Sequence, residues 1–559
     1  MSRTDDYDTA PFRIEMETTT MATEPMSSHG GDDDIHPSVH DRRWLILGVL
    51  CMSLLIIVMD NTILNVAIPS LIVDLGATNS QIQWIVDAYV LVFAGLLLTT
   101  GSLSDRYGRK GALQLGIVLF GIGSAAAAMS TTAEGLIATR AFMGIGGALI
   151  MPATLSILTN VFRDPRERAR AIAVWAGFSG LAVAIGPITG GFLLEHFSWH
   201  SVFWVNIPIG LTALVLGAIF VPTSRDPQKG RIDPLGALLS FFGLTSLLFG
   251  IIEGPAKGWT DPLVVASFAI AVVLLASFML WELHTEHPML DLTVFRNPRF
   301  SAGSGTITLV FFAMFGSLLL MTQYWQLVHG YSPLQAGIRL LPYAVTMMIV
   351  APLSARFVER QGTKRIVTLG LGLVATGLVL LSTIASRSPY WLVISYFVVM
   401  AAGMGMTMAP ATESVMGSLP RAKAGVGSAI NDTTRQVGGA LGVAVIGSVV
   451  TSVYSQRIFD LAGVFGLAGP QQAMAESSLG GAQQVATSLG ADAGAFVQAA
   501  NDSFVDAMSI GLRVGAIVSL FAAVMAWRFL PSHATEPQIL PLADPVDGTG
   551  TISAPVAGS

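Results

Sequence analysis

The chain has 559 residues, of which 52% are hydrophobic and only 12% are charged, and its mean hydropathy is +0.64. This composition excludes an ordinary soluble domain, because the surface of such a domain needs more charged side chains. The net charge of -6 is accompanied by no basic patch of the kind that binds nucleic acid.

The apolar residues fall into segments long enough to cross a bilayer. One helical span needs roughly 20 apolar residues, so a chain of this length holds about fourteen spans with short connections. We therefore predict an all-α integral membrane protein. The predicted spans are residues 44–68, 82–102, 112–131, 135–160, 169–194, 202–221, 234–252, 262–282, 302–327, 336–357, 365–384, 390–412, 425–450 and 510–530.

Three segments outside these spans differ in composition. Residues 1–41 are polar and lack the apolar stretch of a secretory signal, so we expect a disordered N-terminal tail. Residues 531–559 are rich in Pro, Ala, Gly and Thr and predict a second tail. Residues 452–508 predict a long extracytoplasmic loop, with a candidate interfacial helix between Ala491 and Ala507.

The basic residues predict the orientation of the chain in the membrane. Short cytoplasmic loops carry an excess of Lys and Arg, and here the basic loops follow the even-numbered spans. Lys257 and Arg387 are the main exceptions. We therefore expect the even-numbered loops and both tails in the cytoplasm, below an inner (plasma) membrane. The basic loop residues are Arg106, Arg109, Lys110, Arg163, Arg166, Arg168, Arg170, Arg225, Lys229, Arg231, Arg296, Arg299, Arg356, Arg360, Lys364, Arg365, Arg421 and Lys423.

Two loops of similar sequence predict an internal repeat. Residues 101–110, GSLSDRYGRK, follow the second predicted span, and residues 356–365, RFVERQGTKR, follow the tenth. Two related six-helix halves would leave such a repeated Gly/Arg turn.

Several motifs together resemble the major facilitator superfamily. The segment 101–113 looks like its loop signature, and 136–144 and 177–191 extend the likeness. Residues 59–69, MDNTILNVAIP, and 84–89, WIVDAY, are similar to the fourteen-span drug:proton antiporters, including quaternary ammonium efflux pumps.

This resemblance implies the major facilitator fold, with two six-helix halves and two extra central helices. It implies an N-terminal half over residues 42–221, two linker helices with their flanks over 222–300, and a C-terminal half over 301–530. The implied activity is proton-coupled multidrug efflux of the kind that gives antibiotic resistance.

The loop signature predicts a gate. Asp105 and Arg109 are expected near helix ends, where a carboxylate can meet both a helix N-terminus and an arginine and so hold one conformation shut. Gly101, Arg106 and Gly108 complete the signature. The alternative is that the basic residues only set the topology.

The glycines of the fifth span predict close packing against another helix. Gly186, Pro187, Gly190 and Gly191 resemble the antiporter signature, which implies export. Ordinary small-residue packing would give the same pattern, since it occurs in every helical membrane protein.

Charges within the spans mark the predicted binding site, since an ionisable group in hydrocarbon is costly and rare. At 1.5 Å per residue the depths of Asp60, Asp87 and Arg140 agree to roughly 5 Å, which predicts one shared water-filled cavity. Asn61 and Asn65 are further polar candidates for proton or substrate binding.

Two ionised carboxylates and one arginine give such a site a net charge near -1, which attracts a proton or a cation. We expect the acids to alternate between protonated and cation-bound states, with Arg140 biasing release, a role that resembles the one proposed for the family's span-four arginine. In the alternative, Asp60 and Arg140 form a structural ion pair.

A second set of charges is predicted nearer the cytoplasm. Asp432 and Arg435 lie one helical turn apart and are interpreted as an inner gate or structural pair, with a proton site as the alternative. Glu413 is interpreted either as a third proton candidate or as a solvated interfacial residue. All three are secondary candidates.

An enzyme is not expected, because no nucleophile with a base, no metal-ligand spacing and no phosphate-binding loop is found. We expect no cofactor beyond the proton gradient, no metal, no nucleic acid, and a monomer whose partners are a small-molecule substrate, protons and lipid. A channel, a receptor and an importer are disfavoured. An exporter of an endogenous metabolite, amino acid or self-made antibiotic remains the main alternative.

Overall fold

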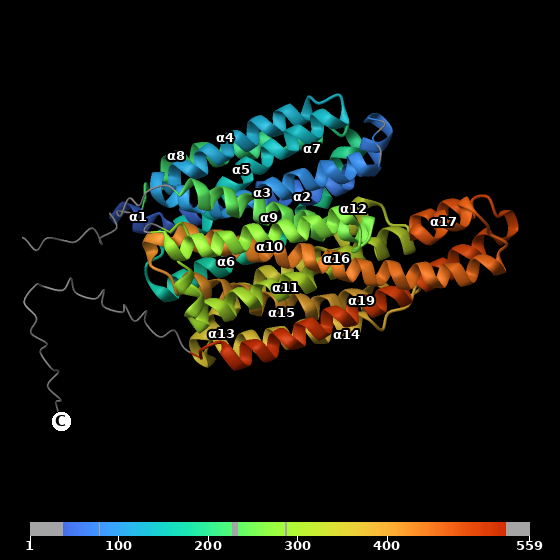
Figure 1. The fold of residues 1–559 in the computed structure, drawn as a ribbon. Helices are drawn as coiled ribbons and strands as arrows, with labels where there is room; N and C mark the ends of the chain where they lie inside the picture. The colour runs from blue at the N-terminus through green and yellow to red at the C-terminus, as the bar shows by residue number, and fades with distance from the viewer. Residues whose placement is uncertain (1–36, 76, 78, 226–232, 286–287, 533–559) are drawn as a thin grey trace, which may run out of the picture.

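The computed structural model describes residues 37–532 apart from 76, 78, 226–232 and 286–287. Fourteen helices in this part of the chain are long and apolar enough to cross a membrane, which confirms the predicted number. The helices run side by side, and both ends of the described chain lie at one end of the bundle (Figure 1). We call this end the terminal side and the opposite end the distal side.

The first half contains the short helix α1 and the spans α2 to α8, of which α7 and α8 form one span. Their bounds are α1 Pro37–Asp41, α2 Arg43–Leu75, α3 Asn79–Tyr107, α4 Arg109–Ala128, α5 Ala133–Val161, α6 Pro165–His196, α7 Ser201–Trp204 and α8 Asn206–Phe220. Two further spans follow, α9 Pro234–Lys257 and α10 Pro262–His284.

The second half begins after a short 3-10 turn, η1 Leu292–Arg296. Its elements are α11 Pro298–Gln323, the π-helical turn η2 Tyr324–Val328, α12 Pro333–Arg339, α13 Leu341–Gln361, α14 Thr363–Leu381, α15 Tyr390–Met416, η3 Arg421–Lys423, α16 Ala424–Val464, α17 Pro470–Ser477, α18 Leu479–Ala486, η4 Gly490–Asp492 and α19 Ala493–Phe529.

Several helices begin at the same two-residue signal. A capping side chain accepts a hydrogen bond from a backbone amide of the first turn. The next residue is a proline, whose missing amide hydrogen costs nothing because the first amides of a helix have no partner within it. Asp164 starts α6, Asp233 starts α9 and Asp261 starts α10 in this way. Asn297 and Ser332 do the same for α11 and α12. These starts are therefore local properties of the sequence.

The two halves repeat the same packing. In the first half α2 packs on α6, α5 packs on both α3 and α4, and α4 packs on α8. In the second half α11 packs on α16, α15 packs on both α13 and α14, and α14 packs on α19. The two halves meet where α6 packs on α13 and where α3 packs on α16. The predicted architecture of two six-helix halves is confirmed.

The repeated loops predicted from the sequence form equivalent turns. Gly108 has a φ of 117° before α4, and Gly362 has a φ of 84° before α14, a region that favours glycine. The backbone amide of the residue after each glycine donates a hydrogen bond at 3.0 Å. Arg109 donates to the carbonyl of Ser224, and Thr363 donates to the carbonyl of Ser532. Each acceptor follows the last helix of its half, so the turn anchors the end of that half.

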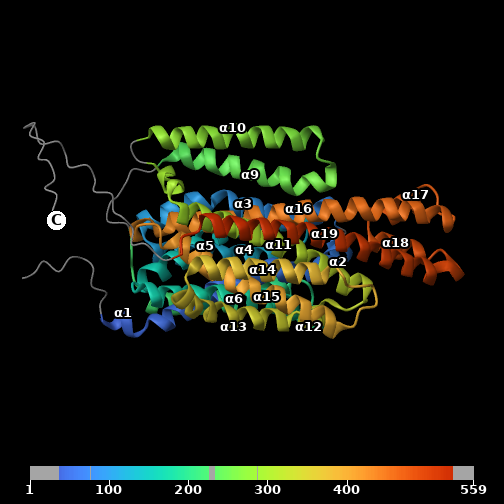
Figure 2. The ribbon, with the colours of Figure 1, turned by 90° about the horizontal axis from the view of Figure 1, so that it is seen from below.

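The two extra helices form a layer beside the bundle. Figure 2 shows α10 outermost and α9 between α10 and the rest of the molecule. Helix α10 packs chiefly on α9, and α9 packs on α3 and α16, one helix from each half. The linker pair thus lies beside the junction between the halves.

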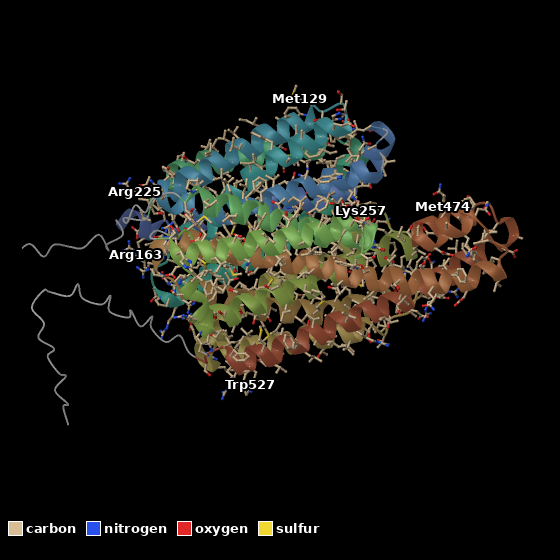
Figure 3. The ribbon with its side chains drawn as sticks, viewed as in Figure 1. Met129, Arg163, Arg225, Lys257, Met474 and Trp527 are labelled. Carbon is tan, nitrogen blue, oxygen red and sulfur yellow. The ribbon has the colours of Figure 1, made fainter. Side chains whose placement is uncertain are left out.

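The positions of basic residues match the predicted alternation. Figure 3 places Arg163 and Arg225 at the terminal side, and Lys257 and Met474 at the distal side. Lys257 was one of the two predicted exceptions.

The prediction of a long loop over residues 452–508 was wrong. Helix α16 continues to Val464, α17 and α18 follow, and α19 begins at Ala493. Leu479 and Phe496 are buried in this extension, and they belong to the same hydrophobic core as the second half. The candidate interfacial helix is the start of α19 and is continuous with the last span.

Parts of the predicted tails fall outside the described residues. This applies to residues 1–36 of the N-terminal tail and to residues 533–559 of the C-terminal tail. Residues Pro37–Asp41, which were predicted as disordered, form the short helix α1.

Candidate functional site

A buried ion pair joins two spans of the first half. Asp60 on α2 and Arg140 on α5 are both 0% exposed, and Arg140 Nη1 donates to Asp60 Oδ2. Arg140 Nε also donates to the carbonyl of Ile85 at 3.1 Å, and its guanidinium lies 4.4 Å from the ring centroid of Tyr89. The structure therefore brings together two of the three predicted central charges.

Two polar residues that the sequence analysis missed complete this cluster. Asn206 Nδ2, at the start of α8, donates to Asp60 Oδ1 at 3.0 Å and lies 3.1 Å from Ser124 Oγ on α4. Ser124 Oγ donates to the carbonyl of Phe203 at 2.8 Å. An amide inside an apolar span was the available signal for Asn206.

The cluster retains unused hydrogen-bonding capacity. Arg140 Nη2 and Asn206 Oδ1 are buried and find no partner among the described residues. A buried pair is stable only while both charges are present, since losing one leaves the other uncompensated. Protonation of Asp60 would therefore free the Arg140 side chain to change partners.

Asp87 does not join this pair, which corrects the predicted three-residue cavity. Tyr89 faces Arg140, and a residue two positions away on a helix is turned by roughly 200°. Asp87 instead lies within electrostatic range of Glu253 on α9. Its Oδ2 atom is buried without a hydrogen-bond partner in the described chain.

The two predicted asparagines lie on α2. Asn61 Nδ2 donates to the carbonyl of Ile57 at 3.0 Å, one turn earlier on the same helix. Asn65 lies one turn after Asn61, and its side chain is outside the described residues.

The loop signature ties the two halves together at the terminal side. Asp105, at the end of α3, accepts from the backbone amides of Gly425 at 2.8 Å and Val426 at 3.2 Å, at the start of α16. Arg109 pairs with Asp105 at 2.6 Å and donates at 2.8 Å to each of the carbonyls of Arg421 and Ala422. We call this set of contacts the latch.

Gly101 of the signature permits the latch to form. A Cβ on Gly101 would lie 2.6 Å from the carbonyl oxygen of Gly425, so the glycine permits α3 and α16 to approach closely. Arg106 lies 5.4 Å from the ring centroid of Tyr107. The carboxylate at a helix N-terminus with a neighbouring arginine is the predicted arrangement.

The glycines of α6 face two different helices. Gly186 packs against Thr62 and Gly190 against Ile63, both on α2. A Cβ on Gly191 would lie 2.6 Å from the Cβ of Leu334 on α12. Pro187 contacts Gly337 of the same helix. The predicted close packing thus includes a contact between the halves.

The secondary candidates form two separate arrangements. Asp432 and Arg435 are buried but are not paired within 4.0 Å. Asp432 accepts from Asn431 Nδ2 at 3.2 Å. Arg435 Nη2 donates to Thr412 Oγ1 at 3.2 Å, and the guanidinium lies 4.8 Å from the ring centroid of Trp175 on α6. The two groups lie within electrostatic range of each other, and the hydrogen bond and ring contact of Arg435 join α16 to α15 and α6.

Glu413 is not a solvated interfacial residue. It pairs with Arg168 at 2.9 Å, and the two side chains are 14% and 11% exposed. The pair joins α15 to α6 at the terminal side, and Arg299 lies within electrostatic range of both residues. Glu413 therefore forms a second ionic contact between the halves on the same side of the bundle as the latch, and it does not join the central pair.

Glu413→Gln is expected to lower the free energy of unfolding by about 1–3 kcal/mol, because it removes a mostly buried charged partner and leaves Arg168 and Arg299 close together. Thermal unfolding in detergent, followed by intrinsic fluorescence, measures this. The control is Glu359→Gln, whose partner Arg170 is 47% exposed and whose loss should cost less than about 1 kcal/mol. Equal effects of the two changes would contradict the structural role of Glu413.

The described residues contain no group of three or more His, Cys, Asp or Glu side chains arranged to hold a metal ion.

Two repeated six-helix halves, buried charges within the spans and an ionic latch between the halves define a polytopic membrane transporter. The chain belongs to the Major Facilitator Superfamily, which it matches over residues 50–443. The resemblance read from its motifs is thereby confirmed.

Three relatives match most of the chain. It is 35% identical to the multidrug efflux pump LfrA of Mycolicibacterium smegmatis, covering 87% of this chain and 95% of LfrA. It is 32% identical to the tetracenomycin C resistance and export protein of Streptomyces glaucescens, covering 87% and 91%. It is 34% identical to the methyl viologen resistance protein SmvA of Salmonella typhimurium, covering 87% and 98%.

Proposed function

We propose that the chain is a proton-coupled antiporter that exports drugs or other amphipathic, cationic small molecules across the inner membrane by alternating access. The observation that carries this proposal is the Asp60–Arg140 pair, buried within membrane spans and hydrogen-bonded to Asn206. A buried ionisable pair is costly in a membrane, and such groups line proton and substrate pathways. Relatives named for multidrug efflux and methyl viologen resistance support the substrate class.

The proposed cycle uses the two ends of the bundle alternately. A proton arriving from outside neutralises a buried carboxylate and releases the organic cation held there, since the two compete for one negative charge. Arg140 favours return of the proton once the site faces the opposite side. The latch closes the terminal side while the distal side is open, and it separates in the other half of the cycle.

The terminal side is the proposed cytoplasmic side. The basic loops gather there, as the positive-inside rule requires. No cofactor, metal or nucleic acid takes part in this proposal. The substrate, protons and surrounding lipid are the partners of a monomer.

A second candidate is export of an antibiotic or metabolite made by the cell itself. One relative is a tetracenomycin C resistance and export protein, which favours this possibility. The same proton machinery would serve such a substrate, so the two candidates differ only in what the chain carries.

The function is tested by imposing a proton gradient on vesicles that contain the purified chain and following ethidium fluorescence. We expect gradient-dependent efflux that an uncoupler abolishes, and we expect Asp87→Asn to reduce the initial rate by about 10²-fold, within the range for loss of a proton-transferring group. The control is Asp74→Asn, an exposed carboxylate at the end of α2, which should transport normally.

Normal efflux by the Asp87→Asn variant would remove that acid from the coupling mechanism. If the native chain moves no organic cation under any gradient, the cation proposal fails and the self-made antibiotic or metabolite becomes the substrate to test.

A further inference from the structure

A cavity of about 460 Å³ lies between the linker helices and the first half. Its walls come from α3, α5, α9 and α10, so it is separate from the Asp60–Arg140 pair inside the first half. The volume lies within the roughly 300–1,000 Å³ of small-molecule sites.

The walls of this cavity are apolar and aromatic. Trp84 of α3 and Phe249 of α9 both line it and contact each other, with ring centroids 6.0 Å apart. Thr245 and Ser246 supply hydroxyl groups, and Thr245 Oγ1 is buried without a partner in the described chain. Aromatic faces attract organic cations, and the apolar walls suit a lipophilic one.

Charged side chains lie beside the residues that line the cavity. Asp87 lies one turn from Trp84 on α3, and Glu253 lies one turn from Phe249 on α9. Each acid is therefore next to a residue that lines the cavity. Glu253 is 5% exposed and pairs with Lys257 at 3.3 Å. With both acids ionised, the three groups have a net charge of about -1, which one monovalent cation would neutralise.

The cavity is accessible from the membrane. Leu263 and Ile270 of α10 line it and are each 50% exposed on a helix that spans the bilayer. Helix α10 packs chiefly on α9 and is the outermost helix on this side of the molecule (Figure 2). A molecule dissolved in the bilayer can therefore reach the aromatic pair laterally.

We propose that this cavity is a binding site for a lipophilic organic monocation, which enters from the bilayer, lies against the contacting rings of Trp84 and Phe249, and places its charge near Asp87 and Glu253. This inference rests on the proposed export of organic cations and names the site that first receives them. The linker helices then have a direct role in substrate capture.

The test is equilibrium binding of radiolabelled tetraphenylphosphonium to the full chain in phosphatidylcholine nanodiscs, without any gradient. Glu253→Gln removes one charge and Ser246→Trp fills the cavity, and each should weaken binding about tenfold, the ratio that a moderate interaction energy produces. The matched control is Ala269→Trp, an exposed position of α10 that does not line the cavity and should bind like the parent.

A third variant distinguishes a specific effect on the site from misfolding, which would also weaken binding. Lys257→Gln removes the cation that competes for Glu253, and its side chain is 41% exposed, so the fold should tolerate the change. We expect this variant to bind tetraphenylphosphonium several-fold more tightly, a gain that a folding defect cannot produce.

Parent-like binding by Glu253→Gln, Ser246→Trp and Lys257→Gln would overturn the site. If only Ser246→Trp weakens binding, the cavity holds an apolar occupant such as a lipid acyl chain, and the cation site is likewise overturned. Binding with the expected pattern but no gradient-driven efflux would uphold the site and reject the transport proposal. Gradient-driven efflux together with unaltered binding in the variants would uphold the transport proposal and reject the site.

Discussion

Asp60→Asn is expected to abolish export and to destabilise the protein, because it leaves the fully buried charge of Arg140 without its partner. Removing one member of a buried pair costs about 3–5 kcal/mol. Gradient-driven ethidium efflux and thermal unfolding in detergent measure the two effects separately. Asp506→Asn is the matched control, since its partner Arg457 is 43% exposed, and it should change stability by less than about 1 kcal/mol.

A double variant separates structure from transport at this pair. In Asp60→Asn with Arg140→Gln both charges are absent, so no buried charge is left without a partner. We expect stability to return while export stays below about 1% of the parent rate, because the Asp60 carboxylate, one of the two proposed coupling acids, is absent. Normal export by the double variant would make the pair purely structural.

The fold was largely predictable because two independent signals agree. Hydropathy predicts fourteen spans. The basic loops follow every second span, as they should if no span has been missed or added. The extension between α16 and α19 was mispredicted because its residues, such as the Gly480–Gln484 run, are too polar for a span. Its helices depend instead on burial of side chains such as Leu479 and Phe496, which a hydropathy window does not detect.

The central pair was predictable from depth alone, whereas the position of Asp87 was not. The three charges lie at similar depths along their helices. However, Asp87 and Tyr89 point in different directions around α3, and it is Tyr89 that faces Arg140. Glu253 was missed because the predicted span ended one residue before it, at 252. That Asp87 faces Glu253 follows from α9 packing on α3, which no local pattern specifies.

Gly425→Ala is expected to open the terminal side of the protein. A Cβ at this position would lie 2.5 Å from the carbonyl oxygen of Gly101 and 2.7 Å from Asp105 Cγ, so α3 and α16 would have to separate. Overpacking of this kind costs about 1–3 kcal/mol in the closed state. The ratio of open to closed molecules should therefore rise by roughly 5- to 150-fold.

Spin labels at Tyr107→Cys on α3 and Arg356→Cys on α13, with Cys51→Ala, report this change, since both positions are exposed at the terminal ends of opposite halves. The parent should give one short distance, and Gly425→Ala should add a longer one. Gly447→Ala on the same helix is the control, because its nearest neighbouring atom would be 3.9 Å away. If both alanine variants give the parent's distances, the latch does not hold the terminal side shut, and the alternating gate must lie elsewhere along α3 and α16.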